Sequence, residues 1–184
     1  AMWQKKYNDI GVSFNVSYIQ LLDGEFIDKL IAKARELQVD PRFVMVELTE
    51  SCSADDTEML SRQFNRLRKL GFKIAMDDFG TEYASFGLLH DVSMDVLKID
   101  QKFVRGLIRK GNKTDMAIIQ SVVEMCRQLS IQTIAEGIET EEIQDIIRSI
   151  GVTYLQGYLY SRPVPAREFE RMIMEEQQRA EQYV

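Results

Sequence analysis

Side chains that bind soft metals or form cross-links are scarce in this sequence. Its 184 residues include two cysteines and one histidine. Cys52 and Cys126 are far apart and lack the Cys-x-x-Cys spacing of a zinc or redox site, and His90 has no second histidine nearby. The sequence therefore predicts neither a disulfide framework nor a zinc site, and such cysteine usage is typical of a reducing cytoplasm.

An excess of positive charge and long apolar runs are also lacking. Lysine and arginine number 23 against 29 aspartates and glutamates, which gives a net charge of −6. Without a basic patch we expect no binding to nucleic acid. Because no apolar run is long enough to cross a bilayer, we expect no direct membrane contact from this segment. The sequence does not decide whether a longer protein carries a membrane anchor elsewhere.

Short apolar runs that alternate with helical patterns dominate the chain. Apolar residues make up 45% of it, which suits one globular domain. Bursts of β-branched and aromatic residues predict strands at residues 11–16, 43–49, 72–78, 95–100, 131–137 and 152–157. Amphipathic stretches predict helices at residues 24–38, 55–71, 113–130, 140–151 and 168–184. This rhythm predicts an α/β fold with a parallel sheet, either doubly wound or closed into a barrel.

Each predicted strand carries a polar residue at or near its carboxyl end. These residues are Asn15, Glu47, Asp77, Asp78, Lys98, Asp100, Glu136 and Gln156. Any one of them could cap a helix or face solvent. The carboxyl ends of parallel strands share one face, where ligands bind, so we expect these side chains to converge.

Converging carboxylates would repel one another without cations, and this favours a metal site. Oxygen ligands without cysteine or histidine favour Mg²⁺ or Mn²⁺, with Ca²⁺ as an inhibitory or silent substitute. The adjacent Asp77 and Asp78 could each reach a different ion of a two-metal site. Lys98 either pairs structurally with Asp100 or holds the attacking water or a phosphate, and the two roles are compatible.

Six ordered segments resemble one known family. They read FNVSYIQL, VELTES, AMDDFGTEYAS, LKIDQKFV, AEGIET and YLQGYLYSRP, and they span essentially the whole chain. In this order and spacing they resemble the EAL domain, the cyclic di-GMP phosphodiesterase family of bacterial signalling proteins. The resemblance implies a TIM-like (β/α) barrel that opens cyclic di-GMP to linear pGpG with a metal-held water and Mg²⁺ or Mn²⁺. We expect a cytoplasmic domain, or the cytoplasmic part of a larger, membrane-anchored bacterial protein.

The resemblance also implies metal ligands at four matching positions. Asn15, Glu47 and Asp77 would hold the first metal. Asp78 would serve the second metal. The match therefore implies a two-metal site on the strand ends.

Catalytic and supporting roles follow from the same resemblance. Lys98 would position the water, and Glu136 would stand at the second metal or act as general base. Glu50 would brace the loop after the paired aspartates. Substrate-lining or supporting roles would fall to Glu50, Asp100, Glu139 and Gln156.

The sequence departs from the family pattern in two places. The Glu-Ala-Leu motif is absent, so we expect a single partial domain over 1–184: the end of a helix at 1–10, about six of eight βα units at 11–164 and a C-terminal helix at 165–184. In the loop after Asp78, Glu82 and Ala84 replace the usual glycine and serine. We therefore expect impaired turnover. That loop or the open barrel edges could also form the contact of a homodimer.

Two alternatives come from other functional classes. An inactive domain of this type would act as a cyclic di-GMP receptor or as a protein-interaction module. A third possibility is another metal-dependent barrel enzyme, such as an enolase-type lyase. Such an enzyme shares the carboxylates and the lysine, but this assignment does not explain the segments AEGIET and QGYLYSRP. Product formation that depends on Lys98 separates the phosphodiesterase from the receptor.

Overall fold

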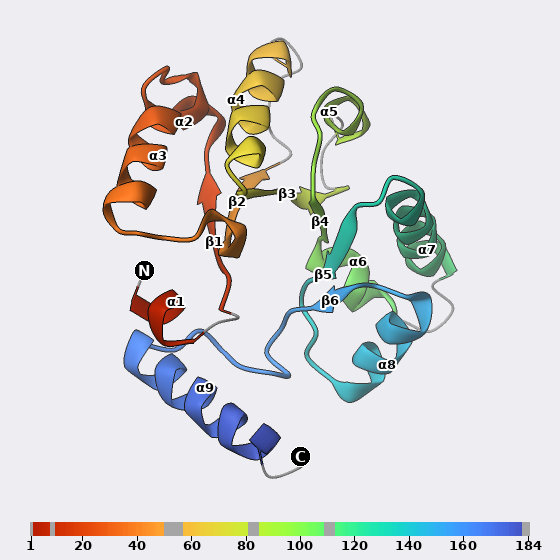
Figure 1. Cartoon of the computed structure of the whole chain (residues 1–184). Helices are drawn as coiled ribbons and strands as arrows, with labels where there is room; N and C mark the ends of the chain where they lie inside the picture. The colour runs from red at the N-terminus through yellow and green to blue at the C-terminus, as the bar shows by residue number, and fades with distance from the viewer. Residues whose placement is uncertain (1, 8–9, 50–56, 81–84, 109–112, 182–184) are drawn as a thin grey trace.

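A curved, six-stranded parallel sheet forms the centre of the molecule (Figure 1). The computed structural model describes residues 2–7, 10–49, 57–80, 85–108 and 113–181. The strands are β1 (Val12–Val16), β2 (Val44–Thr49), β3 (Lys73–Phe79), β4 (Val96–Ile99), β5 (Gln132–Ala135) and β6 (Tyr154–Leu155). They pair in chain order, and every pairing is parallel. The predicted α/β class and the six predicted strands are confirmed.

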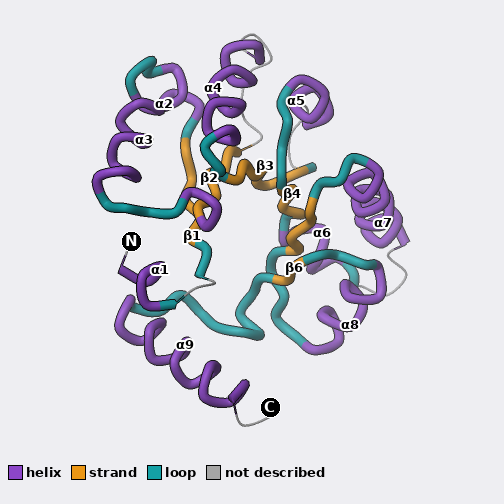
Figure 2. The backbone as a smooth tube through the Cα atoms, viewed as in Figure 1, coloured by secondary structure: helices purple, strands orange, loops and turns teal. Residues whose placement is uncertain are grey.

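Helices connect the strands and lie outside the curved sheet (Figure 2). The longer ones are α3 (Phe26–Glu36), α4 (Thr57–Lys69), α7 (Lys113–Gln128), α8 (Glu141–Ile150) and α9 (Ala166–Glu181). The shorter ones are α1 (Met2–Lys6), α2 (Tyr18–Leu22), α5 (Ser85–Asp91), α6 (Gln101–Gly106) and the 3₁₀ helix η1 (Pro41–Phe43). Of the helices described, none combines the length and the apolarity that a membrane span requires.

The sheet stays open within the described residues, because β1 and β6 each pair with a strand on one side only. At the side of the molecule between these two strands, α1 lies against α9 (Figure 1). The rings of Trp3 and Phe169 join the two helices with centroids 5.2 Å apart, and Lys6 forms an ion pair with Glu170. The expected incomplete barrel, with six βα units, is what the sheet shows.

The middle strands are buried on both faces. Ile74, Ala75 and Met76 of β3 have no exposed surface, and helix side chains such as Phe64 and Ile119 cover the sheet from outside. Burying apolar surface stabilises the fold by roughly 25 cal/mol per Å². This two-sided burial explains the continuous apolar runs that predicted the strands. It also makes the few charged side chains inside the core costly unless they have partners.

Candidate active site

Charged side chains meet at the carboxyl edge of the sheet. Glu47 on β2, Asp77 on β3 and Lys98 on β4 are 5%, 8% and 4% exposed. In the β2–β3 register Glu47 lies opposite Ala75, two residues before Asp77, so both carboxylates project from the same face. Glu136 follows β5 at the same edge, and its backbone N–H donates to the carbonyl of Ile99. The predicted convergence of strand-end residues thus describes this group.

The ammonium of Lys98 lies among three carboxylates. Its Nζ is 2.8 Å from Glu47 Oε2, 2.8 Å from Asp77 Oδ1 and 2.7 Å from Glu136 Oε1. Burial alone would lower the pKa of Lys98, but the hydrogen bonds to Asp77, Glu136 and Glu47 outweigh it and raise the pKa above its ordinary value. Lys98 is therefore cationic at neutral pH. Three negative charges against one positive charge leave an excess that a further cation would neutralise.

The two adjacent aspartates lie on one side of the sheet because the strand is irregular there. Asp78 has φ of 55°, in the left-handed region, and the β3–β4 register shifts between Met76 and Phe79. In a regular strand neighbouring side chains alternate between faces, so this distortion is what keeps both carboxylates at the same edge. Ligand atoms of Asp77, Asp78 and Glu136 lie within 4.8 Å of one another.

Two of these carboxylates have raised pKa values. Burial raises the pKa of Glu136, the hydrogen bond from Lys98 opposes the rise, and the charge of Asp77 adds to it. Burial and the charges of Asp77 and Asp100 raise the pKa of Asp78. For both carboxylates the effect of burial on the pKa exceeds the opposing effect of the Lys98 charge. A cluster of carboxylate oxygens in this condition fits a hard divalent cation such as Mg²⁺, Mn²⁺ or Ca²⁺.

Asp100 occupies a different place from the one that strand periodicity predicts. β4 ends at Ile99, and Asp100 is the N-cap of α6, where its Oδ1 accepts a hydrogen bond of 2.7 Å from the backbone N–H of Lys102. Within the described residues the ion-pair partners of Lys98 are three other carboxylates. The predicted Lys98–Asp100 pair is therefore wrong, and Asp100 lies beside Asp78 instead.

A small cavity adjoins the carboxylate group. It measures about 190 Å³ and is lined by Gln101, Arg105, Glu136, Gly137, Glu139, Gln156, Gly157 and Tyr158. A Cβ on Gly157 would lie 2.1 Å from the carbonyl oxygen of Ile138, so only glycine allows the two loops to pack here. Arg105, which sequence reasoning missed, pairs with Glu139 at 2.6 Å. A signal was available in the sequence, because Arg105 lies one helical turn after Gln101 and directly follows the LKIDQKFV segment.

The remaining predicted residues are placed less completely. Asn15 on β1 lies opposite Glu47 in the β1–β2 register, and its side chain is exposed. Glu50, Glu82 and Ala84 fall outside the described residues. The structure thus brings Asn15 to the same edge, beside the first carboxylate.

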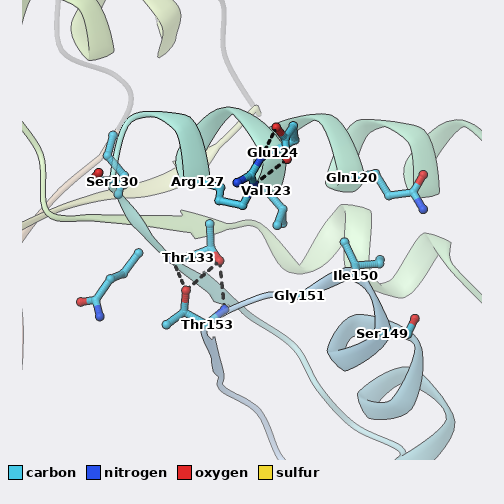
Figure 3. Close-up of a pocket in the computed structure, with 12 residues that line it drawn as sticks. Gln120, Val123, Glu124, Arg127, Ser130, Thr133, Ser149, Ile150, Gly151 and Thr153 are labelled. Carbon is cyan, nitrogen blue, oxygen red and sulfur yellow. Dashed lines mark hydrogen bonds and ion pairs between the residues drawn. The ribbon is translucent and has the colours of Figure 1, made fainter.

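A larger cavity lies at the opposite, amino-terminal edge of the sheet, between α7 and α8 (Figure 3). It measures about 520 Å³. Two pairs of its side chains bind each other: Glu124 pairs with Arg127 at 2.7 Å, and the hydroxyls of Thr133 and Thr153 are 3.3 Å apart. Because the two charged side chains of this cavity pair with each other, the carboxylate group remains the candidate active site.

Known proteins resemble this chain over most of its length. The model of the EAL domain matches residues 1–163. The cyclic di-GMP phosphodiesterase PdeB of Shewanella oneidensis is 36% identical over 169 residues, which are 91% of this chain and 19% of PdeB. The chain spans about a fifth of the length of the curated relatives that it matches.

Solved structures share the fold. The EAL domain of Mycobacterium smegmatis DcpA superposes with a TM-score of 0.88 at 30% identity, over 95% of this chain and 78% of that one. Klebsiella pneumoniae BlrP1, in complex with manganese and cyclic di-GMP, gives a TM-score of 0.78 at 31% identity, over 87% of this chain and 41% of that one.

Proposed function

This chain belongs to the EAL domain family, and from that premise we propose that it hydrolyses cyclic di-GMP to linear pGpG with a metal-activated water. The observation that carries the proposal is the Lys98 ammonium among three carboxylates at the carboxyl edge of a parallel sheet, of which Glu47 and Asp77 are buried. The phosphodiesterase name of PdeB and the manganese and cyclic di-GMP complex of BlrP1 support it.

The proposed metal ligands are the carboxylates that lie close together. Asp77, Asp78 and Glu136 would hold Mg²⁺ or Mn²⁺, with Glu47 and Asn15 on the first-metal side. A bound divalent ion lowers the pKa of a water ligand and so supplies a nucleophile at neutral pH. Ca²⁺ suits the same oxygens but has a looser coordination geometry, so we expect it to bind and inhibit.

Lys98 and Glu136 have the proposed catalytic roles. Lys98 keeps its proton at neutral pH and would stabilise the charge that develops on the phosphoryl oxygens. A carboxylate whose pKa is raised is a stronger base, so Glu136 is suited to take a proton from the attacking water. The 2.7 Å contact between them would orient Glu136 for this step.

The cavity beside Glu136 is the proposed position of a guanine base of the substrate. Gln156 offers a carboxamide that can donate to and accept from a guanine edge. Glu139 holds the guanidinium of Arg105 at the rim of this cavity. Asp100, which caps α6, would position Asp78 through the side-chain hydrogen bond between the two residues.

The test is a pGpG assay with Mn²⁺. We expect the chain to form pGpG, and we expect Lys98→Ala to abolish this product. Lys102→Ala, which removes an exposed lysine four residues further on, is the matched control and should keep wild-type turnover. Equal activity of the Lys98→Ala and Lys102→Ala variants would contradict the proposal.

A cyclic di-GMP receptor is the second candidate function. The sheet is open beside β1, and Asn15 is exposed there, so the first-metal side is less enclosed than the side at Glu136. Incomplete enclosure weakens metal binding and misplaces the nucleophile, and an error of ~1 Å costs ~10²-fold in rate. Saturable binding of cyclic di-GMP in Ca²⁺, without pGpG in Mn²⁺, would assign the receptor role.

A cytoplasmic location and a homodimer complete the proposal. The free thiol of Cys126, buried on α7, fits a reducing compartment. The open edges of β1 and β6 are the proposed dimer contacts, since an unpaired strand edge can pair with another chain. The loop after Asp78, the other expected contact, lies outside the described residues.

A further inference from the structure

A basic cavity lies at the amino-terminal end of β3, opposite to the proposed active site. It measures about 540 Å³ and is lined by Arg42, Asn65, Arg68, Lys69, Gly71, Phe72, Lys73 and Asp95. Four of these side chains are cationic and one is anionic. Because the whole chain has a net charge of −6, this concentration of positive charge is local and opposes the overall balance.

A glycine brings three segments together around this cavity. Gly71 follows α4 with φ of 99°, a conformation that favours glycine. A Cβ at this position would lie 3.3 Å from Arg42 Cγ, so the absence of a side chain lets η1 approach the end of α4. Arg42 from η1 therefore lines the same cavity as Lys69 from α4 and Lys73 from β3.

Carboxylates hold both arginines in place, and each guanidinium still has a donor nitrogen available. Asp95 accepts from Arg68 Nε at 3.3 Å and from Nη2 at 3.1 Å, and it also accepts from the backbone N–H of Ile74 at 2.9 Å. Asp40 holds Arg42 through Nε and Nη2. In neither arginine do the described residues include an acceptor for Nη1. The carboxylates thus orient the guanidiniums without using all their donors.

The two lysines have no carboxylate within ion-pair distance among the residues that the structure describes. Cations at the end of α4 have an ordinary explanation, because they interact favourably with the helix C-terminus. That explanation covers Arg68 and Lys69. It does not cover Arg42 or Lys73, which reach the cavity from outside the helix.

We propose that this basic cavity binds the phosphate group of a small phosphorylated compound in solution. Oriented guanidinium donors match phosphate oxygens, and the two free ammonium groups add charge. The volume suits a ligand of nucleotide size. A bilayer of anionic lipids fits less well, because the net charge of −6 repels it and the carboxylate of Asp95 lies among the cations.

The experiment titrates the 184-residue chain with inorganic phosphate and then with pyrophosphate, at constant ionic strength, by calorimetry and by amide NMR shifts. Lys69→Gln/Lys73→Gln removes the two free ammonium groups. The matched control, Lys29→Gln/Lys33→Gln, makes the same charge change on α3, where the lysines pair with Glu25 and Glu36. Circular dichroism checks that both variants fold.

We expect saturable binding, stronger for pyrophosphate, with shifts confined to amides around Gly71. The Lys69→Gln/Lys73→Gln substitutions should raise the Kd by about tenfold or more, and the control substitutions should leave it unchanged. No saturable binding, or an equal loss in both variants, overturns the proposal. Binding to phosphatidylglycerol vesicles without binding to either free anion also overturns it. None of these outcomes depends on phosphodiesterase activity.

Discussion

Lys98 shows how a buried charge is tolerated at the scale of one residue. Its ammonium and the three carboxylates around it are each costly alone, and each one offsets the desolvation of the others. Removing the lysine therefore costs more than the lost contacts, because all three carboxylates lose the cation that they share. The cluster is a stability determinant as well as a candidate active site.

Lys98→Met tests this interdependence. We expect the free energy of unfolding to fall by about 3 kcal/mol or more, since Glu47, Asp77 and Glu136 lose their shared cation. Urea denaturation in the presence of EDTA measures it. Lys102→Met is the control for an exposed lysine and should change the stability little; an equal loss in both variants would contradict the argument.

Asp78 is the opposite case, a carboxylate that costs stability. Its unfolded-state pKa is near 3.8, and burial together with the charges of Asp77 and Asp100 raises it in the folded protein. Protonated Asp78 therefore favours the folded state at low pH. This contribution is lost as the pH rises through the raised folded value, so ionised Asp78 lowers stability at neutral pH without metal.

The Asp78→Asn variant tests this pH dependence of the stability. Asparagine tolerates the left-handed conformation at φ 55° and carries no charge. At neutral pH and without metal we expect the melting temperature to rise by on the order of 2 °C, with the gap shrinking as the pH falls through the raised pKa of Asp78 and vanishing below pH 3.8. Metal affinity should fall in the same variant. Thermal melts across pH, with and without Mn²⁺, measure both effects, and a gap independent of pH would refute the assignment.

The sequence predicted which residues lie at the site better than it predicted which of them pair with one another. Polar residues at strand ends indicated Glu47, Asp77, Lys98 and Glu136, because parallel strands fix a common edge. Strand periodicity failed where the strands stop being regular. It assigned Asp100 to Lys98, although β4 has already ended there.

At the scale of elements, length decided what the sequence could predict. The five long helices were predicted because each contains several apolar repeats, whereas α2, α5 and α6 are five to seven residues long and contain almost none. A local signal for α2 was present. Ser17 and Gln20 form a capping box, in which each side chain accepts from the other residue's backbone N–H.

Phe169→Ala tests the contact between α1 and α9. Trp3 is the chain's single tryptophan and packs on Phe169, and its buried Nε1 has no hydrogen-bond acceptor among the described residues. We expect Trp3 emission to shift to longer wavelength as water reaches the ring, and α9 amides to exchange faster, with about 1 kcal/mol of lost local stability. Met174→Ala, at similar exposure on α9, is the control and should leave the emission unchanged.

At the scale of the whole molecule, the open sheet is the main consequence of the fold. The structural neighbours are TIM-like barrels, in which closure removes strand edges, whereas among the residues described for this chain β1 and β6 pair on one side only. Apolar patterning predicted the strands and their parallel pairing. It could not predict how α1 and α9 would pack, because that contact joins residues 3 and 169 and has no local signal.

The open edge predicts self-association of this chain. Val12 at the start of β1 is 44% exposed beside unpaired backbone groups, so we expect the sedimentation coefficient to rise with protein concentration. Val12→Lys places a charge on this edge and should keep the chain monomeric, because a lysine disfavours strand addition. Leu129→Lys is the matched control, since Leu129 is an exposed apolar residue after α7 and away from the edge, and it should associate like the wild type. A wild-type chain that stays monomeric at every concentration, or equal dissociation by both variants, would show that the edge of β1 is not the contact.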